Sequence, residues 1–368
     1  MASDEELVMS KPNVGSSHAR SAPLQPSLSW RLTSSVVMGL TAALSRGFIY
    51  TFNSVEVTGL QKFLDLLDKR KDVAGRERGL ITVSNHISMA LGSFFYSGQV
   101  LPTHRLLHSP HGGLFQPTIP QAIRLLSSQP FITPRPYNAE KLPEGDVPDP
   151  FTAGDGLTFT TTGADRHTAP SAYRANRHSW VHVFPEACVH QHPTASMRYF
   201  KWGVSRLILE SEPMPEVVPV FIDGTQRVMP EDRGFPRFLP RVGVGIRVAF
   251  GDLVDAERTF GDLRARWRDL VRRANGNGRG SGNGNGGGDK AKPRAMGELT
   301  DELKYGPEAV EIRVECARRV REEIVKLRRS LGYPEEEPGF ELAETWARDP
   351  PREKFRSRVD ESLVNKKE

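Results

Sequence analysis

A histidine and a glutamate that each follow an apolar run are the residues of this sequence best suited to acid–base chemistry. His86 comes after the run 79–84, and Glu186 comes after the run 180–184. An imidazole can take up and return a proton near neutral pH, and a carboxylate can accept hydrogen bonds from hydroxyl groups. If the runs are neighbouring strands, both side chains lie at the edge where α/β enzymes bind ligands. Taken singly, such a histidine is more often structural and such a glutamate more often solvated.

Two cations follow the glutamate closely. Arg198 and Lys201 fall at the beginning of a helical pattern over 196–210. Cations there can hold a phosphodiester group through charge-assisted hydrogen bonds. Surface charge is the ordinary role of both residue types, so the alternative is a pair of solvated side chains.

The two cysteines, Cys188 and Cys316, are too few for a disulfide framework. Cys188 offers a different chemistry, that of a thiolate nucleophile with His182 or His190 as its base. A buried, inert cysteine is the commoner case, and no oxyanion-hole motif accompanies this one. The net charge of +5 favours anionic surfaces only mildly, and the Gly-rich run around Arg279 lacks the aromatic residues typical of nucleic-acid binding. We therefore expect no nucleic acid as a partner.

The elements that must position these residues alternate along the chain. Apolar runs and strict alternation predict four strands, at 79–84, 180–184, 217–222 and 242–250. Helical spacing of apolar residues predicts three helices, at 120–126, 196–210 and 307–331. This alternation indicates an α/β fold, with a mixed central sheet flanked by helices in a single domain.

Composition divides the rest of the chain into segments of different character. Ser-, Pro- and Gly-rich or polar stretches are typical of loops and disordered segments, because they cannot bury enough apolar surface to fold. The expected units begin with a disordered leader at 1–28 and a membrane-interfacial segment at 29–54. The domain follows at 55–270, with a flexible insertion at 134–176, and is followed by a Gly-rich linker at 275–293. The chain then continues with an amphipathic helix at 301–332, whose outer face is charged and which docks on the domain, and a charged, loose tail at 334–368.

The interfacial segment is predicted from its composition. No acidic residue occurs between Glu6 and Glu56, which resembles a mitochondrial transit sequence except for the acidic residues at the very start. Its apolar part lies between Arg31 and Arg46, which are closer together than the ~20 residues needed to cross a hydrocarbon core. Aromatic residues at both ends suit a helix lying in the headgroup plane. The alternative is an ordinary core helix.

Two longer strings carry more information than any single motif. Residues 179–186, Ser-Trp-Val-His-Val-Phe-Pro-Glu, are followed by residues 196–203, Ser-Met-Arg-Tyr-Phe-Lys-Trp-Gly. Together they resemble the signature block of the tafazzin family, phospholipid–lysophospholipid transacylases that remodel cardiolipin and belong to the glycerolipid acyltransferases. The resemblance spans about residues 30–345 and is absent from the leader, the two low-complexity stretches and the tail.

The resemblance implies a mechanism, from which this sequence departs at one position. The family's first motif is His-x4-Asp, in which the histidine is the general base on the acceptor's hydroxyl and the aspartate orients the imidazole. His86 matches the histidine, but Leu91 stands at the aspartate's position, and no acidic residue occurs from 87 to 139. We infer that a contiguous block is missing between Met89 and Ala90. The alternative is an acyltransferase-like protein that binds lipid surfaces and has lost the chemistry.

Further roles follow from the same resemblance. Glu186 would contact the acceptor, with Ala187 where the family usually has glycine, a difference that matters if φ is positive there. Arg198 and Lys201 would contact phosphate. The family's blocks around the glycerophosphate and acyl or acceptor sites correspond to Gly113, Phe115, Arg124 and Pro219.

The activity implied by the resemblance is acyl transfer from a phospholipid to a lysophospholipid such as monolysocardiolipin. The family uses no coenzyme A, other cofactor or metal. The implied location is a mitochondrial membrane, with the protein attached peripherally at the interface on the intermembrane-space side.

Overall fold

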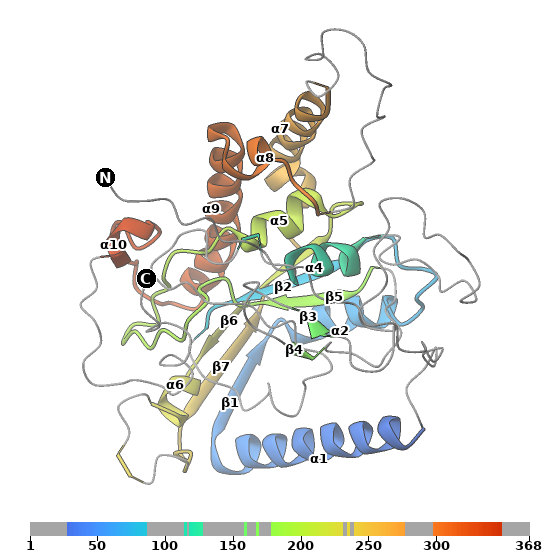
Figure 1. The fold of residues 1–368 in the computed structure, drawn as a ribbon. Coiled ribbons are helices and arrows are strands. Elements are labelled where there is room, and N and C mark those ends of the chain that lie inside the picture. Colours follow the sequence, from blue (N-terminus) through green and yellow to red (C-terminus); the bar gives the residue numbers. More distant parts are fainter. Residues whose placement is uncertain are drawn as a thin grey trace, which may run out of the picture.

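A mixed sheet forms the centre of the molecule in the computed structural model (Figure 1). The structure describes residues 28–86, 114–115, 118–127, 158–159, 167–168, 178–230, 234–235, 239–276 and 297–347. The sheet has the strand order β1-β7-β6-β2-β5. Its strands are β1 (Ser54–Thr58), β2 (Leu80–Ser84), β5 (Trp180–Val183), β6 (Glu216–Asp223) and β7 (Gly245–Phe250). The predicted mixed α/β architecture is therefore confirmed, and β1 is an additional strand.

The register of the sheet brings the two predicted chemical positions to one edge. β2 runs parallel to both β5 and β6, with Val83 opposite Val183 on one side and Pro219 on the other. β7 is antiparallel to β6 and parallel to β1. Because parallel strands end at the same edge, the residues after β2 and after β5 are neighbours.

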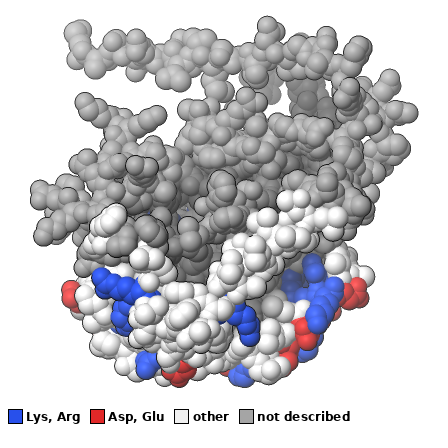
Figure 2. All heavy atoms as spheres, turned by 90° about the horizontal axis from the view of Figure 1, so that it is seen from below, with Lys and Arg blue, Asp and Glu red and all other residues white. Residues whose placement is uncertain are grey.

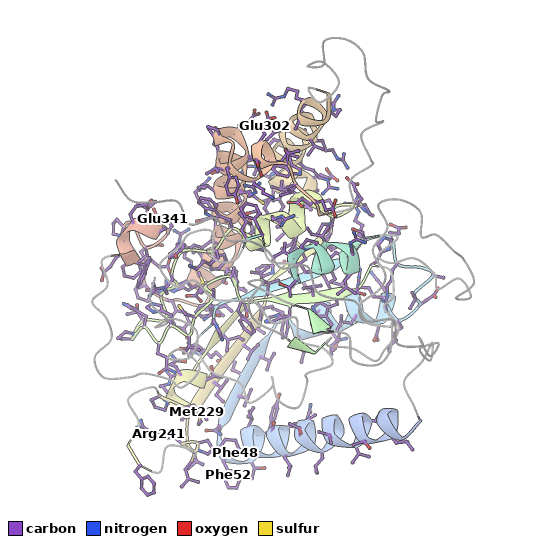
Figure 3. The ribbon with its side chains drawn as sticks, viewed as in Figure 1. Phe48, Phe52, Met229, Arg241, Glu302 and Glu341 are labelled. Atoms are coloured by element: carbon purple, nitrogen blue, oxygen red, sulfur yellow. The ribbon has the colours of Figure 1, made fainter. Side chains whose placement is uncertain are left out.

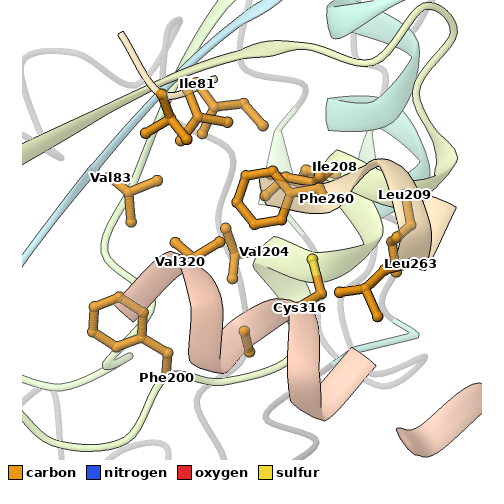
Figure 4. Packing of buried hydrophobic residues seen from close by; sticks show 14 of the residues in the cluster. Ile81, Val83, Phe200, Val204, Ile208, Leu209, Phe260, Leu263, Cys316 and Val320 are labelled. Atoms are coloured by element: carbon orange, nitrogen blue, oxygen red, sulfur yellow. The ribbon is translucent and has the colours of Figure 1, made fainter. Parts of the chain in front are cut away.

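Helices cover both faces of the sheet. The helices are α1 (Leu28–Phe52), α2 (Leu60–Lys69), α4 (Thr118–Leu126), α5 (Gly203–Glu210), α6 (Thr225–Val228), α7 (Ala256–Gly276), α8 (Asp301–Tyr305), α9 (Pro307–Ser330) and α10 (Ala343–Ala347). The main core lies between the sheet and helices α4, α5, α7 and α9, where Val83, Ile208, Phe260 and Val320 meet (Figure 4). On the other face, α2 packs Phe63 against Leu80, Val218 and Val220. A short pair, β3 (Thr158–Phe159) and β4 (His167–Thr168), lies within the predicted insertion 134–176, most of which is outside the described residues.

The predicted helix over 196–210 is wrong in its first half. The helix begins only at Gly203, and residues 196–201 are neither helix nor strand. The main-chain N–H groups of Met197, Arg198 and Lys201 donate to partners elsewhere in the chain: the carboxylates of Glu336 and Glu186 and the carbonyl of Pro185. These groups are therefore not available for the bonds to residue i−4 that a helix requires.

The long C-terminal helix predicted at 307–331 is confirmed, but the expected helix at 301–332 is divided at Gly306 into α8 and α9. The charged face of α9 is not wholly exposed. α9 packs on β6, α5 and α7, and its residues Arg313, Arg321 and Arg328 are buried. Each of these arginines donates to main-chain carbonyl oxygens of other segments. α7, which the sequence did not predict, runs to Gly276 and buries Phe260 and Trp267 in the same core, so the expected domain end at residue 270 falls inside a helix.

The tail was predicted to be loose, and for residues 334–347 this is wrong. Phe340 and Trp346 are buried against Tyr199, and the indole N–H of Trp346 donates to the carbonyl of Phe340 at 2.8 Å. Aromatic side chains tie this segment to the domain although its charged residues suggest solvation. The remainder of the tail, 348–368, the leader up to residue 27 and the linker 277–296 lie outside the described residues.

α1 packs little of its length on the rest of the molecule. Large apolar side chains along it are exposed, among them Leu32, Val36, Leu40 and Leu44. The alternative of an ordinary core helix is therefore wrong. The helix continues past Arg46, and among the described residues Ser35–Phe52 is long and apolar enough to cross a membrane, with a mean hydropathy of 1.2.

Candidate active site

A buried carboxylate joins three segments of the chain. Glu186 lies in the turn after β5 and is 2% exposed. One of its oxygens, Oε1, accepts a hydrogen bond from the main-chain N–H of His86 at 2.7 Å, and Oε2 accepts one from the main-chain N–H of Arg198 at 2.9 Å. The structure thus brings together the ends of β2 and β5 and the segment 196–201. The neighbourhood of His86, Glu186 and Arg198 expected from the sequence is confirmed.

The turn that carries Glu186 has a left-handed residue. Ala187 has φ 58° and donates its N–H to the carbonyl of Phe184 at 3.2 Å. This is the position at which the family usually has glycine, and a left-handed conformation costs an L-residue about 1–2 kcal/mol. Glycine would adopt the same backbone without that cost, so the substitution is accommodated at some expense in stability.

His86 is held on both sides by main-chain bonds. The side chain of Asn85 bonds both the N–H and the carbonyl of Ile222 on β6, each at 2.8 Å, which fixes the end of β2. The carbonyl of His86 accepts from the N–H of His190 at 2.8 Å. The imidazole stacks on Phe184, with ring centroids 4.6 Å apart. Its ring position is therefore determined by the strand end and by the aromatic side chain before the Glu186 turn.

Burial controls the protonation of the carboxylate. Loss of solvation raises the pKa of Glu186 to about 7, against the opposing effect of its two main-chain hydrogen bonds and of the positive charges on Arg321 and Arg198. A carboxyl group with a pKa near neutrality can both accept and donate a hydrogen bond under physiological conditions. Such a group suits contact with a hydroxyl that changes its own protonation during a reaction.

The two predicted cations lie next to Glu186, but neither is a solvated surface charge. Arg198 and Lys201 are 6% and 4% exposed. The Arg198 guanidinium lies 4.4 Å from the ring centroid of Trp346, and the Lys201 ammonium donates to the hydroxyl of Tyr199 at 2.8 Å. Burial lowers the pKa of Lys201 to about 8. Weakly solvated cations of this kind interact more strongly with an anion than surface cations do.

The other predicted contacts are not gathered at this place. Phe115 packs against Tyr305 of α8, with its ring 5.6 Å from the guanidinium of Arg313 near the start of α9. Arg124 lies in the last turn of α4. The N–H of Ser179 donates to the carbonyl of Leu125, so this end of α4 lies beside the amino ends of β2 and β5. Pro219 lies within β6 and lines a groove of about 970 Å³ between α7 and α9. Gly113 lies outside the described residues.

His182 forms a polar crosslink between two strands. Its Nδ1 lies 2.7 Å from the Thr82 hydroxyl and its Nε2 lies 3.2 Å from the Ser84 hydroxyl. Burial lowers the pKa of His182 to about 4, so the ring is neutral at physiological pH. Because hydroxyl groups occupy both nitrogens, His182 is not arranged as a base for Cys188. The alternation of Thr82 and Ser84 along a predicted strand was the available sequence signal for this crosslink.

Three residues that contact the segment 196–198 were not predicted from the sequence as site residues. Arg321, Glu336 and Trp346 reach it from α9 and from the chain beyond α9. They lie more than a hundred positions away along the sequence, in stretches without a recognisable motif. Their roles can be recognised only from the tertiary contacts.

Comparison with known proteins identifies the family. No protein-family model matches the chain. The tafazzin of Saccharomyces cerevisiae is 30% identical over an alignment of 362 residues, which covers 87% of this chain and 84% of the yeast protein. The chain belongs to the tafazzin family. A Dictyostelium discoideum protein named taffazin is 28% identical over 209 residues, covering 56% of this chain and 64% of that protein.

A more distant relative supports the same chemistry. An N-acylphosphatidylethanolamine synthase of Arabidopsis thaliana is 33% identical over 79 residues, covering 21% of this chain and 28% of that protein. Together with the tafazzins it identifies the chain as a phospholipid acyltransferase. His86 and Glu186 lie among the described residues, whereas Leu91, which follows His86 by five positions, lies outside them.

Proposed function

We propose that this protein transfers a fatty acyl group from a phospholipid to a lysophospholipid such as monolysocardiolipin, in the remodelling of cardiolipin. The observation that supports the proposal most directly is the placement of His86 and Glu186. The carboxylate of Glu186 accepts a hydrogen bond from the main-chain N–H of His86 at 2.7 Å, so the proposed base and the proposed acceptor ligand are neighbours. In this proposal His86 is the base and Glu186 a ligand of the acceptor.

The proposed reaction is an ester exchange. The hydroxyl of the acceptor gives its proton to the His86 imidazole while its oxygen attacks the ester carbonyl carbon of the donor. The ester C–O bond of the donor then breaks, and the acyl group remains on the acceptor. The proton passes from His86 to the departing oxygen, so that the donor leaves as a lysophospholipid. No net proton or electron is consumed, and the reaction is reversible.

The buried cations are proposed to hold the phosphate of a lipid substrate. Arg198 and Lys201 follow the Glu186 turn on a segment that is itself bonded to that glutamate. A phosphodiester at this place would exchange its hydration for charge-assisted hydrogen bonds from side chains that are already desolvated. Phe115, Arg124 and Pro219 lie on other parts of the fold and remain weaker proposals, together with Gly113.

The proposed location is a membrane surface, with α1 as the interfacial anchor. Exposed apolar side chains line this helix, and the guanidinium of Arg46 lies 5.1 Å from the ring centroid of Tyr50. The face seen in Figure 2 is mostly uncharged where the structure describes it, with scattered lysine and arginine side chains and a few acidic ones among them. This composition fits a lipid headgroup region. By family membership we propose a mitochondrial membrane, on its intermembrane-space side.

An acyl-exchange assay tests the proposal. The full chain is incubated with phosphatidylcholine that carries a radiolabelled acyl chain and with monolysocardiolipin, and labelled cardiolipin is measured. We expect slow transfer, because loss of the orienting acid of a comparable triad lowers kcat by about 10⁴. His86→Ala should abolish the remaining transfer. Transfer that is unchanged in His86→Ala would contradict the proposed role of the histidine.

Leu91 favours a second candidate, a lipid-surface-binding protein without catalytic activity. This candidate predicts that the chain binds phosphatidylcholine–cardiolipin vesicles normally but forms no labelled cardiolipin above the His86→Ala background. Alkylation of Cys188 separates both candidates from a cysteine mechanism. Under either of them, blocking the thiol leaves transfer unchanged, whereas a cysteine nucleophile would lose it completely.

A further inference from the structure

The chain beyond α9 reaches back to the segment that carries Arg198. Oε1 of Glu336 accepts a hydrogen bond from the main-chain N–H of Met197 at 2.7 Å. Oε2 of the same carboxylate accepts one from Arg321 at 2.5 Å. The side chains of Arg321 and Glu336 are 7% and 8% exposed, so this ion pair is buried.

Arg321 completes the contact from α9. Its Nη2 donates to the carbonyl of Met197 at 2.8 Å, and its Nε donates to the carbonyl of Arg198 at 3.0 Å. The ion pair therefore binds the N–H and the carbonyl of Met197 and also the carbonyl of Arg198. The remaining main-chain group of this peptide, the N–H of Arg198, donates to Glu186. Residues 197–198 are held between the Glu336–Arg321 pair and Glu186.

This segment needs outside support because it has no regular structure of its own. Residues 196–201 belong to neither a helix nor a strand, and their side chains are buried. A buried main-chain group that loses its partner costs the free energy of its desolvation. The position of the segment is thus set by the side chains that satisfy it. Trp346, whose ring lies 4.4 Å from the Arg198 guanidinium, adds a contact from the same C-terminal stretch.

We propose that Glu336 and Arg321 are positioning residues that hold segment 196–198 so that Glu186 and Arg198 are presented together to the lipid acceptor. The assignment of an acceptor to Glu186 and Arg198 rests on the proposed function, whereas the positioning of the segment does not. Because the pair acts on acceptor-binding groups and not on the base, its loss should weaken acceptor binding more than the chemical step.

The substitution Glu336→Gln tests the proposal in the full chain. Both carboxylate oxygens are in use, and an amide has only one oxygen, so the variant cannot serve Met197 and Arg321 together. Glu335→Gln is the matched control, because it removes the same charge one residue earlier from a side chain that is 71% exposed and paired with Arg329. If Glu336→Gln fails to fold, Glu336→Asp replaces it, since it keeps the charge and withdraws the carboxylate by one methylene.

Amide hydrogen exchange measures positioning without any turnover. In Glu336→Gln we expect the amides of Met197 and Arg198 to exchange about 10- to 100-fold faster, the range that loss of a charge-assisted hydrogen bond gives. The amides of β6, such as Phe221, should keep their wild-type rates. Glu335→Gln should match the wild type throughout. Unchanged rates at Met197 and Arg198, or equal acceleration at Phe221, would overturn the proposal.

Kinetics with monolysocardiolipin in phosphatidylcholine vesicles measure the consequence for the acceptor. We expect the KM for monolysocardiolipin to rise about 10-fold in Glu336→Gln, with kcat changed less than about twofold. A loss confined to kcat would overturn the role in acceptor binding. If the wild type itself shows no turnover, the proposed function fails for this chain, and the exchange rates alone decide whether Glu336 positions the segment.

Discussion

At the scale of single residues, Glu186 combines a structural and a chemical role. Its two oxygens bind main-chain groups from the end of β2 and from segment 196–201, and it is almost fully buried. Burial outweighs these hydrogen bonds and the nearby arginines, so the pKa of Glu186 lies far above that of a solvated glutamate. The alternative of a solvated turn glutamate is therefore wrong.

The raised pKa predicts how stability depends on pH. An acid whose pKa is higher in the folded chain than in the unfolded chain binds more protons when folded. Its contribution to stability is therefore present below the unfolded-state pKa and is lost as the pH rises to the folded-state pKa. For Glu186 this window runs from 4.5 to about 7. We expect the wild type to lose about 3 kcal/mol of unfolding free energy over this window relative to Glu186→Gln.

Urea unfolding of both chains at a series of pH values measures this difference. Glu335→Gln is the control, because it makes the same substitution at an exposed side chain. A gap between the wild type and Glu186→Gln that does not change with pH would mean that the carboxyl group titrates normally.

At the scale of elements, strands were predicted more reliably than the connections between them. β2, β5 and β6 are short apolar runs bounded by polar residues, and a local pattern suffices to identify them. Segment 196–201 has apolar residues at helical spacing, yet its main-chain donors bind Glu186, Glu336 and the carbonyl of Pro185. These hydrogen bonds prevent the helix that the local pattern favours. A sequence window cannot contain those partners.

The exposed apolar side of α1 predicts a specific role in membrane binding. Figure 3 shows Phe48 and Phe52 near one end of this helix, beside Arg241. If α1 lies in the bilayer interface, Leu40→Arg should weaken binding to phosphatidylcholine–cardiolipin vesicles about 10-fold or more, because a buried leucine contributes about 1.5–3 kcal/mol. Vesicle co-sedimentation at constant salt measures the change.

Val314→Arg is the matched control for this experiment. Val314 is also an exposed apolar residue of a long helix, but it lies on α9, on the side of the sheet away from α1 in Figure 1. Equal loss of binding in both variants would show that added positive charge or general destabilisation causes the effect. Unchanged binding in Leu40→Arg would exclude α1 as the anchor.

At the scale of the whole molecule, one continuous core joins parts that the sequence separated. α7 and α9 lie on either side of the Gly-rich stretch, and both contribute to the core that covers the sheet of the predicted domain. The helix expected to dock from outside therefore supplies part of the central core. Its arginines 321 and 328 also hold the loop that precedes α5.

The chain is expected to lack a block of residues between Met89 and Ala90. The chain aligns with most of yeast tafazzin. By the motif resemblance, His86 is the expected base and Leu91 occupies the position expected for the aspartate. We expect the transcript or genomic sequence between the codons for Met89 and Ala90 to contain an in-frame block with an acidic residue. Restoring that block should raise acyl transfer by about 10⁴. A transcript and gene in which the two codons are adjacent would establish that the residue is truly absent.

The sequence by itself determined the strand–helix alternation, the ends of β2 and β5 as chemical positions, and the family, because these depend on local periodicity or on contiguous strings of residues. Only the tertiary structure decided that Glu186 is buried with a pKa of about 7, that Arg198 and Lys201 are not surface charges, and that the C-terminal stretch contacts segment 196–198. The physical reason is that desolvation and hydrogen-bond satisfaction depend on every neighbour in space. Most of those neighbours, such as Glu336 and Trp346, are remote along the chain.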